Sequence, residues 1–343
     1  MQRFIVGTGR CGSTLLSRML AESPHLLSLS EFFNGLDMSE RFAPDPIDGE
    51  TLAELIGREQ PVITAVIKRG YPVEEVTYPF ADDNEARGPL GRYRRGDALP
   101  WLLVSMLPQL AQPPDRLFDE LIVFARARSE ASPRDHYLAL FDWLAERMGR
   151  HFWVERSGSS IDYAAELVRL YPEARFVHLH RSGPEVALSM REHHAYRLPI
   201  SLIYDTPLAD GRPVSELPAL DFESAPKPGD TLSRILEAHP PAEYFGRYWS
   251  DQIMRGQPAL ARLPDDRVLQ VTFEEMVSDP VPVLRQIARF FDLAHDTSGA
   301  DWIPRAAGLV TGIPRLRLPD LSDSETANLL SACAPGNRLL LRT

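Results

Sequence analysis

The chain has 343 residues, of which 44% are hydrophobic and 25% are charged, so it can bury a sizeable core. Its formal net charge of -11 disfavours a nucleic-acid binder that depends on phosphate contacts. The two cysteines exclude a disulfide framework and have no zinc-site spacing, and no apolar run is long enough to span a bilayer. Because the first predicted strand begins too early to leave room for a secretory signal, we expect a cytoplasmic enzyme.

The first twenty residues predict a strand, a glycine-rich turn and a helix. Arg3–Val6 is a short apolar run bounded by glycine, which is typical of a buried strand. The turn Gly7–Thr14 follows, and Leu15–Leu20 has the apolar spacing of a helix. This order of elements points backbone N–H groups and the positive end of a helix dipole at one spot. We therefore expect a phosphate or sulfate site here, the alternative being an ordinary strand-to-helix turn.

The turn is close to the nucleoside-triphosphate loop G-x-x-x-x-G-K-[ST] but lacks its lysine. Gly7, Gly12 and Thr14 fit the pattern, Ser13 stands in place of the lysine, and Arg10 is the only cation. In this form the turn resembles the 5′-phosphosulfate loop of sulfotransferases, whose donor is 3′-phosphoadenosine 5′-phosphosulfate. The resemblance implies that the donor is bound by Gly9, Arg10, Cys11, Gly12, Ser13 and Thr14, and that Arg10 takes part in catalysis.

Cys11 also raises the alternative of a cysteine-based phosphatase. That class needs an arginine six positions after the cysteine, where this chain has Ser17, and Arg18 is one position too late. We therefore expect Cys11 to be a small filler where many relatives have serine. The nearby helix N-terminus is expected to lower the pKa of its thiol.

Glu31 is the predicted general base. Leu26–Leu29 predicts a second short strand, and Glu31 follows it in a loop. In several sulfotransferase branches a glutamate at this place accepts the acceptor's proton, and the resemblance implies that role for Glu31. A solvated or capping glutamate is the plain alternative.

The next hundred residues carry no further motif. Val62–Ile67 is rich in β-branched residues and predicts a strand, and Tyr71–Asp97 predicts a long loop, either solvated or a lid over the acceptor. The pattern then becomes helical, with candidates at 101–110, 116–128 and 133–148.

The residues from 152 to 189 add three predicted site residues. Phe152–Gly158 reads as a strand and turn, in which Arg156 occupies the place of the sulfonate-facing lysine of many sulfotransferases. Phe176–Leu179 predicts another strand, followed by Arg181 and, eight positions on, Ser189. In the family an arginine and a serine at this spacing bind the donor's 3′-phosphate, so the resemblance implies that Arg181 and Ser189 do so. A guanidinium fork suits such a phosphate.

Four histidines are further candidates for a catalytic role. His178 and His180 share one face of a predicted buried strand, so packing explains them better than catalysis. His193 and His194 follow the Ser189 helix and remain an alternative base.

The C-terminal half predicts a further strand and helix after a variable stretch. Residues 195–241 read as an insertion that shapes the acceptor pocket, and 242–263 as a long helix. The strand 267–271 leads into Phe273–Met276, which resembles the Tyr-Glu-Asp-Leu segment of sulfotransferases. Basic C-terminal segments close over the 3′-phosphate in that family, which makes Arg315 and Arg317 candidates.

Together these patterns predict a single α/β domain over residues 1–343, with a parallel sheet flanked by helices. The resemblance implies transfer of a sulfuryl group from 3′-phosphoadenosine 5′-phosphosulfate to the hydroxyl of a small-molecule, carbohydrate or lipid acceptor, with 3′-phosphoadenosine 5′-phosphate as product. It implies no metal. The alternatives are a metal-dependent phosphotransferase with a degenerate loop and a nucleotide-binding module without turnover.

Overall fold

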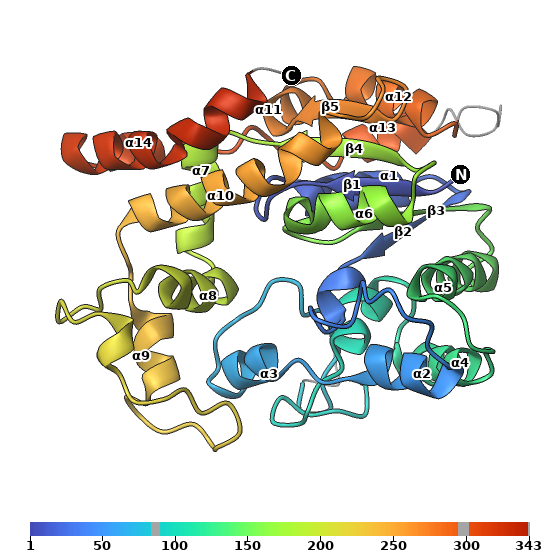
Figure 1. The fold of residues 1–343 in the computed structure, drawn as a ribbon, viewed down its shortest axis with the longest axis horizontal. Coiled ribbons are helices and arrows are strands. Elements are labelled where there is room, and N and C mark those ends of the chain that lie inside the picture. Colours follow the sequence, from blue (N-terminus) through green and yellow to red (C-terminus); the bar gives the residue numbers. More distant parts are fainter. Residues whose placement is uncertain (84–89, 294–301, 342–343) are drawn as a thin grey trace. The chain divides into compact units, whose positions relative to one another are not determined.

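The computed structural model describes residues 1–83, 90–293 and 302–341 (Figure 1). The chain divides into two compact units. Unit 1 comprises Met1–Phe32, Tyr137–Ala187 and Gly246–Thr343, and unit 2 comprises Phe33–His136 and Leu188–Phe245. That the two units function as one domain stays a prediction.

Unit 1 is built on a five-stranded sheet with the order β2-β3-β1-β4-β5. The strands are β1 (Arg3–Val6), β2 (Leu26–Ser30), β3 (Phe152–Arg156), β4 (Arg175–His180) and β5 (Val268–Thr272). All neighbouring pairs are parallel, so the carboxyl ends of the strands meet at one edge. The predicted α/β class with a parallel sheet is confirmed.

Both faces of this sheet are buried, because successive side chains of a strand point to opposite faces. On one face, Ile5 belongs to an apolar cluster that also contains Leu16 of the first helix. On the other face, the ring of Phe4 lies against Trp153 and Phe176 at centroid distances of 5.9 and 5.6 Å. Helices cover both faces, as the parallel arrangement requires (Figure 1).

The helices of unit 1 are α1 (Ser13–Ala21), η5 (Ser160–Tyr163), α6 (Ala164–Leu170), α11 (Phe273–Ser278), α12 (Pro280–Phe290), α13 (Trp302–Ala307), η8 (Leu318–Asp320) and α14 (Asp323–Leu340). The helices that run from one unit into the other are α5 (Pro133–Arg147), α7 (Gly183–Arg191) and α10 (Ala242–Leu260).

The helices of unit 2 are η1 (Phe33–Gly35), α2 (Gly49–Gly57), α3 (Pro61–Lys68), η3 (Leu102–Met106), η4 (Leu107–Gln109), α4 (Asp115–Arg126), α8 (His194–Tyr204), η6 (Val214–Glu216) and α9 (Thr231–Glu237). Of these, η3 is a π-helix. Within the described ranges, no helix has the length and apolar character needed to cross a membrane.

The strand predicted at Val62–Ile67 is wrong, because these residues belong to helix α3. A short apolar run does not distinguish a strand from a buried helix by its period. The deciding residue is Pro61, which stands at the first position of α3, where a fixed φ suits a helix and a missing N–H costs nothing. The predicted loop 71–97 has no helix or strand in its described part, and its residues 84–89 lie outside the described chain.

Candidate functional site

The glycine-rich turn between β1 and α1 has a backbone path that glycine makes possible. Gly12 has a φ of 94°, and a Cβ built on it would lie 2.2 Å from Cδ2 of Phe273. A Cβ on Gly7 would lie 2.4 Å from the carbonyl oxygen of Leu179. Gly12 caps α1, whose first N–H groups therefore open into this turn. The strand, turn and helix predicted from the sequence are all present.

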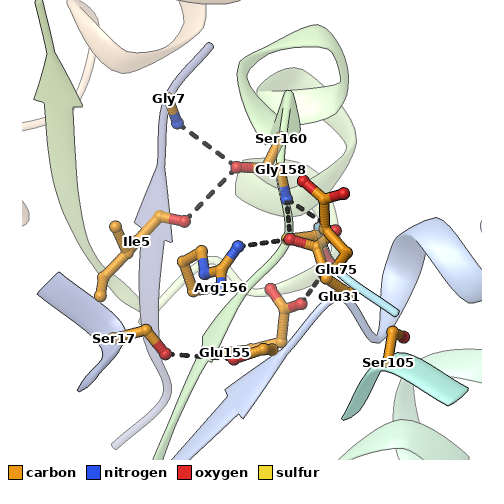
Figure 2. A network of polar contacts seen from close by, with 12 residues as sticks. Ile5, Gly7, Ser17, Glu31, Glu75, Ser105, Glu155, Arg156, Gly158 and Ser160 are labelled. Atoms are coloured by element: carbon orange, nitrogen blue, oxygen red, sulfur yellow. Dashed lines mark hydrogen bonds and ion pairs between the residues drawn. The ribbon is translucent and has the colours of Figure 1, made fainter. Parts of the chain in front are cut away.

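Three hydrogen bonds tie the segment after β3 to β1 and the glycine-rich turn, and those of Ser160 are drawn in Figure 2. The Gly7 N–H donates to Oγ of Ser160 at 3.3 Å, and the Ser160 hydroxyl donates to the Ile5 carbonyl at 3.4 Å. The Ile161 N–H donates to the Gly7 carbonyl at 3.1 Å. These bonds fix the turn that begins at Arg156 beside the candidate anion site. Sequence reasoning missed Ser160, since no motif marks it.

Cys11 lies inside the core and not on the surface of the site. Its side chain is fully buried and belongs to the same apolar cluster as Leu16 and Leu179. Burial raises the pKa of the thiol and outweighs the lowering that Ser13, at the start of α1, exerts on it, so the net effect is opposite to the one expected. The predicted filler role is confirmed, and only the backbone of Cys11 is available to a ligand.

Glu31 and Arg156, predicted separately, form a buried ion pair (Figure 2). Both residues are only 3% exposed, and Nη1 of Arg156 donates to Oε1 of Glu31. The Gly158 N–H donates to both carboxylate oxygens at 3.1 Å, and the Glu31 N–H donates to the Arg156 carbonyl at 2.9 Å. Glu31 also has a φ of 60°, a conformation that a non-glycine residue keeps only under constraint.

The charge of Arg156 also acts on the Cys11 thiol, where it opposes the effect of burial on the pKa. Arg156 is therefore paired with the Glu31 carboxylate and lies within electrostatic reach of the glycine-rich turn. A cation beside an anion-binding turn and a carboxylate beside that cation are the groups that an in-line transfer from an anionic donor needs.

Arg181 leaves the carboxyl end of β4 and reaches back to the glycine-rich turn. Its NH1 donates to the Arg10 carbonyl at 3.4 Å, and its guanidinium lies 4.5 Å from the centre of the Phe273 ring. Phe273 therefore supports both Gly12 and Arg181. Burial is the main cause that lowers the pKa of Arg181, and the charge of Arg317 is the next.

Arg317 is held near Arg181 by the helix that Arg181 precedes. Its backbone N–H donates to both carboxylate oxygens of Glu185 on α7, at 2.9 and 3.1 Å, and the Leu318 N–H donates to the same side chain at 3.0 Å. Glu185 is also 4.0 Å from the Arg181 guanidinium. Two guanidinium groups thus lie within electrostatic reach of each other, an arrangement that a bound anion would stabilise.

The other two residues predicted for the 3′-phosphate differ in their surroundings. Ser189 lies on α7 and is buried. Arg315 has a side chain 76% exposed and is paired with Asp320, so the structure does not bring it to Arg181.

The alternative base His193 lies in unit 2 and faces a carboxylate there. Its Nε2 is 3.3 Å from Oε2 of Glu75, and the residue is 5% exposed. The ring of His194 packs against Tyr71 at a centroid distance of 4.9 Å. Sequence reasoning missed Glu75, which stands in a loop without any periodic pattern. A carboxylate that orients an imidazole is a common arrangement for a general base, so His193 remains an alternative to Glu31.

His178 and His180 are packed, as predicted. His178 is fully buried in β4, and burial lowers its pKa to about 3. Burial also lowers the pKa of His180. Among the described residues, no three His, Cys, Asp or Glu side chains are grouped to hold a metal ion. Independence from metal stays a prediction.

One family model matches the chain: residues 231–297 match the sulfotransferase family. The matched segment contains β5 and α11, and it includes the Phe273–Met276 resemblance. The match of this segment agrees with the family predicted from the sequence. Its last four residues, 294–297, lie outside the described chain.

Solved structures of sulfotransferases resemble the chain over most of its length. The sulfotransferase domain from the curacin biosynthetic pathway is 13% identical, with 99% of this chain and 96% of that chain covered and a TM-score of 0.45. The domain from the Synechococcus PCC 7002 olefin synthase is 16% identical, with 99% and 93% covered and a TM-score of 0.46. Sulfotransferase STF9 from Mycobacterium avium is 16% identical, with 96% and 75% covered and a TM-score of 0.45. Likeness this distant assigns no role to any residue. No curated protein sequence matches the chain.

Proposed function

We propose, from the sulfotransferase-family segment at residues 231–297 and the site around Gly12, that the chain transfers a sulfuryl group from 3′-phosphoadenosine 5′-phosphosulfate to an acceptor hydroxyl. The glycine-rich turn would hold the 5′-phosphosulfate through the backbone of residues 9–14 and the side chains of Arg10, Ser13 and Thr14. Arg181, Ser189 and Arg317 would bind the 3′-phosphate.

The observation that carries this proposal is the pair of cationic groups beside the turn. Arg181 is nearly buried, bonded to the Arg10 carbonyl and supported by Phe273, while Arg317 lies near enough to lower its pKa. A nucleotide that carries phosphate only at its 5′ position needs a single anion site. A pair of guanidinium groups a short distance from the glycine-rich turn adds a second anion site, which suits a ligand with phosphates at both ends.

The transfer would follow an in-line displacement. The acceptor oxygen forms a bond to sulfur as the bond from sulfur to the 5′-phosphate oxygen breaks, and the bisphosphate product leaves with that electron pair. Glu31 would accept the hydroxyl proton. Arg156 holds Oε1 of this carboxylate, and an anionic sulfuryl group near Arg156 would compete for the guanidinium as the proton arrives.

The binding experiment compares four ligands by calorimetry: 3′-phosphoadenosine 5′-phosphate, adenosine 5′-phosphosulfate, ATP, and ATP with Mg²⁺. We expect the bisphosphate to bind most tightly. Tighter binding of ATP with Mg²⁺ would favour a phosphotransferase instead. Turnover with labelled donor and a set of small-molecule, carbohydrate and lipid hydroxyls then tests for catalysis. Tight bisphosphate binding without any transfer would favour the inactive module.

A matched pair of variants tests the 3′-phosphate assignment. Arg181→Ala should weaken the bisphosphate by about 2–4 kcal/mol, the order expected for a lost charge-assisted grip, and should change adenosine 5′-phosphosulfate far less, because that ligand has no 3′-phosphate. Arg169→Ala, an exposed arginine on α6, serves as the control. Equal weakening of both ligands by Arg181→Ala would refute the assignment.

A further inference from the structure

A cavity of about 490 Å³ lies in unit 1, at the edge of the sheet opposite to the glycine-rich turn. It is lined by Met1, Arg3, Ser23, His25, His151, Phe152, Asp292 and Leu293. Arg3 begins β1, His25 directly precedes β2 and Phe152 begins β3, so the cavity lies at the amino ends of three strands. The glycine-rich turn follows the carboxyl end of β1. The two sites are therefore at opposite edges of the same sheet.

Two imidazoles form one wall of this cavity. The rings of His25 and His151 are stacked, with centroids 5.0 Å apart and an interplanar angle of 28°. Their backbones are locked together, because the N–H groups of His151 and Phe152 both donate to the His25 carbonyl, at 2.9 and 3.0 Å. Each imidazole carries at least one N–H donor in either protonation state. The pairing of β2 with β3 thus presents two ring donors at fixed positions.

Arg3 supplies a cation that is held in place before any ligand arrives. It is 5% exposed, its Nε donates to the Phe291 carbonyl at 2.8 Å and its NH1 donates to the Met1 carbonyl at 3.0 Å. The guanidinium lies 4.7 Å from the centre of the Phe152 ring. Burial lowers the pKa of Arg3 to about 10, which leaves the group charged at neutral pH.

Arg3 and Asp292 are the arginine and the carboxylate of the cavity wall. After burial, the groups that act on Arg3 are Asp292, which raises its pKa, and Arg175, which lowers it. Arg175 is anchored by a hydrogen bond from its NH1 to the Phe290 carbonyl at 2.6 Å. Arg175 is not part of the cavity wall, which combines one fixed guanidinium and one carboxylate with the imidazole and hydroxyl groups of His25, His151 and Ser23.

We propose that this cavity is a second anion site, which binds a phosphate or sulfate group through Arg3, His25 and His151. Donors with a fixed geometry around a held guanidinium suit an oxyanion with several acceptor oxygens. The volume is that of a small-molecule pocket and exceeds what a bare ion fills, so an ester of phosphate or sulfate would also fit. The site is independent of the donor site and does not rest on the proposed sulfotransferase activity.

Calorimetric titration tests the proposal with three probes: inorganic phosphate, inorganic sulfate and phenyl phosphate. The test variant is His25→Phe with His151→Phe, which keeps two aromatic rings in the wall and removes their N–H donors. We expect all three probes to bind about tenfold more weakly at the cavity, the order expected when hydrogen bonds to a charged group are lost. Binding at the glycine-rich turn should not change. Tighter binding of phenyl phosphate than of phosphate would identify an ester as the ligand; equal binding would identify the free ion.

His239→Phe is the matched control, because His239 is exposed and lies in unit 2. It should leave every isotherm unchanged. Identical isotherms for the wild type and the double variant would overturn the proposal.

A second measurement needs only the wild-type protein. Diethyl pyrocarbonate modifies accessible imidazoles. His25 is half-buried and His151 is exposed. Sulfate, compared with chloride at equal ionic strength, should protect both histidines from modification and leave His239 reactive, as read by peptide mass spectrometry. Equal modification of His25 and His151 in the two salts would also overturn the proposal.

Discussion

Gly12→Ala should destabilise unit 1 and weaken donor binding together, because Gly12 is restrained in two ways. Its φ of 94° costs a residue with a Cβ about 1–2 kcal/mol. The new Cβ would also lie 2.2 Å from Cδ2 and 2.7 Å from Cε2 of Phe273, so that ring must move, at an overpacking cost of about 1–3 kcal/mol. The free energy of unfolding should therefore fall by about 2–5 kcal/mol, measured by urea denaturation with tryptophan fluorescence.

The control Gly149→Ala separates these two costs. Gly149 also has a positive φ, of 64°, but a Cβ there would meet nothing within 4 Å. The free energy of unfolding of Gly149→Ala should fall only by the cost of the positive φ, about 1–2 kcal/mol. A double-mutant cycle isolates the clash: once Phe273→Ala has removed the ring, adding Gly12→Ala should cost about 1–3 kcal/mol less than it does alone.

The same variant should weaken binding of the bisphosphate nucleotide, since the displaced ring also supports Arg181. Two results would contradict this expectation: free energies of unfolding of Gly12→Ala and Gly149→Ala that agree within about 0.5 kcal/mol, or additive effects of Gly12→Ala and Phe273→Ala in the cycle. The expectation also fails if Gly12→Ala is destabilised as expected and binds the nucleotide with wild-type affinity.

Three further predictions concern charged groups. Glu31→Gln should lower turnover by about 10²–10⁴-fold in steady-state assays, because an amide takes no proton, and should lower the free energy of unfolding by about 3–5 kcal/mol, because Arg156 loses its buried partner. Arg317→Ala should weaken the bisphosphate by about tenfold or more in calorimetry, while the exposed Arg315→Ala leaves it unchanged. The pKa of His178 is lowered from 6.5 to about 3, so the unfolded chain binds this proton first. The free energy of unfolding should therefore fall by up to about 1.4 kcal/mol for each pH unit as the pH is lowered from 6.5 to about 3. His178→Leu should flatten that slope in urea titrations carried out at several pH values.

Several outcomes would contradict these expectations. If Glu31→Gln turns over normally and His193→Asn does not, the base is His193 with Glu75 as its partner. Combining Glu31→Gln with Arg156→Gln should recover stability but not turnover; recovery of both would show that the pair is only structural. Equal losses for Arg317→Ala and Arg315→Ala would exclude a specific role for Arg317.

The sequence by itself determined the parts of the protein whose signals are local. Arg3–Val6, the glycines after it and the helix that follows lie within about twenty residues, so apolar period and glycine placement were sufficient to predict them. The parallel sheet followed from the repeated alternation of strand and helix. Local signals conflicted at Val62–Ile67, where a run of six apolar and β-branched residues suits either element and the apolar period alone does not show that Pro61 starts a helix.

Only the tertiary structure decided which side chains meet. Glu31 and Arg156 are far apart in the chain, and they pair because β2 lies beside β3 with Ser30 opposite Arg156. Phe273 supports Gly12 and Arg181 because β5 joins the sheet beside β4, which carries α11 to the carboxyl edge. Arg317 differs from Arg315, two residues away, through the bonds from its backbone to Glu185. A sequence pattern specifies which face of a strand is buried, but strand order decides which distant charge lies opposite, because the order depends on packing energy summed over the whole sheet.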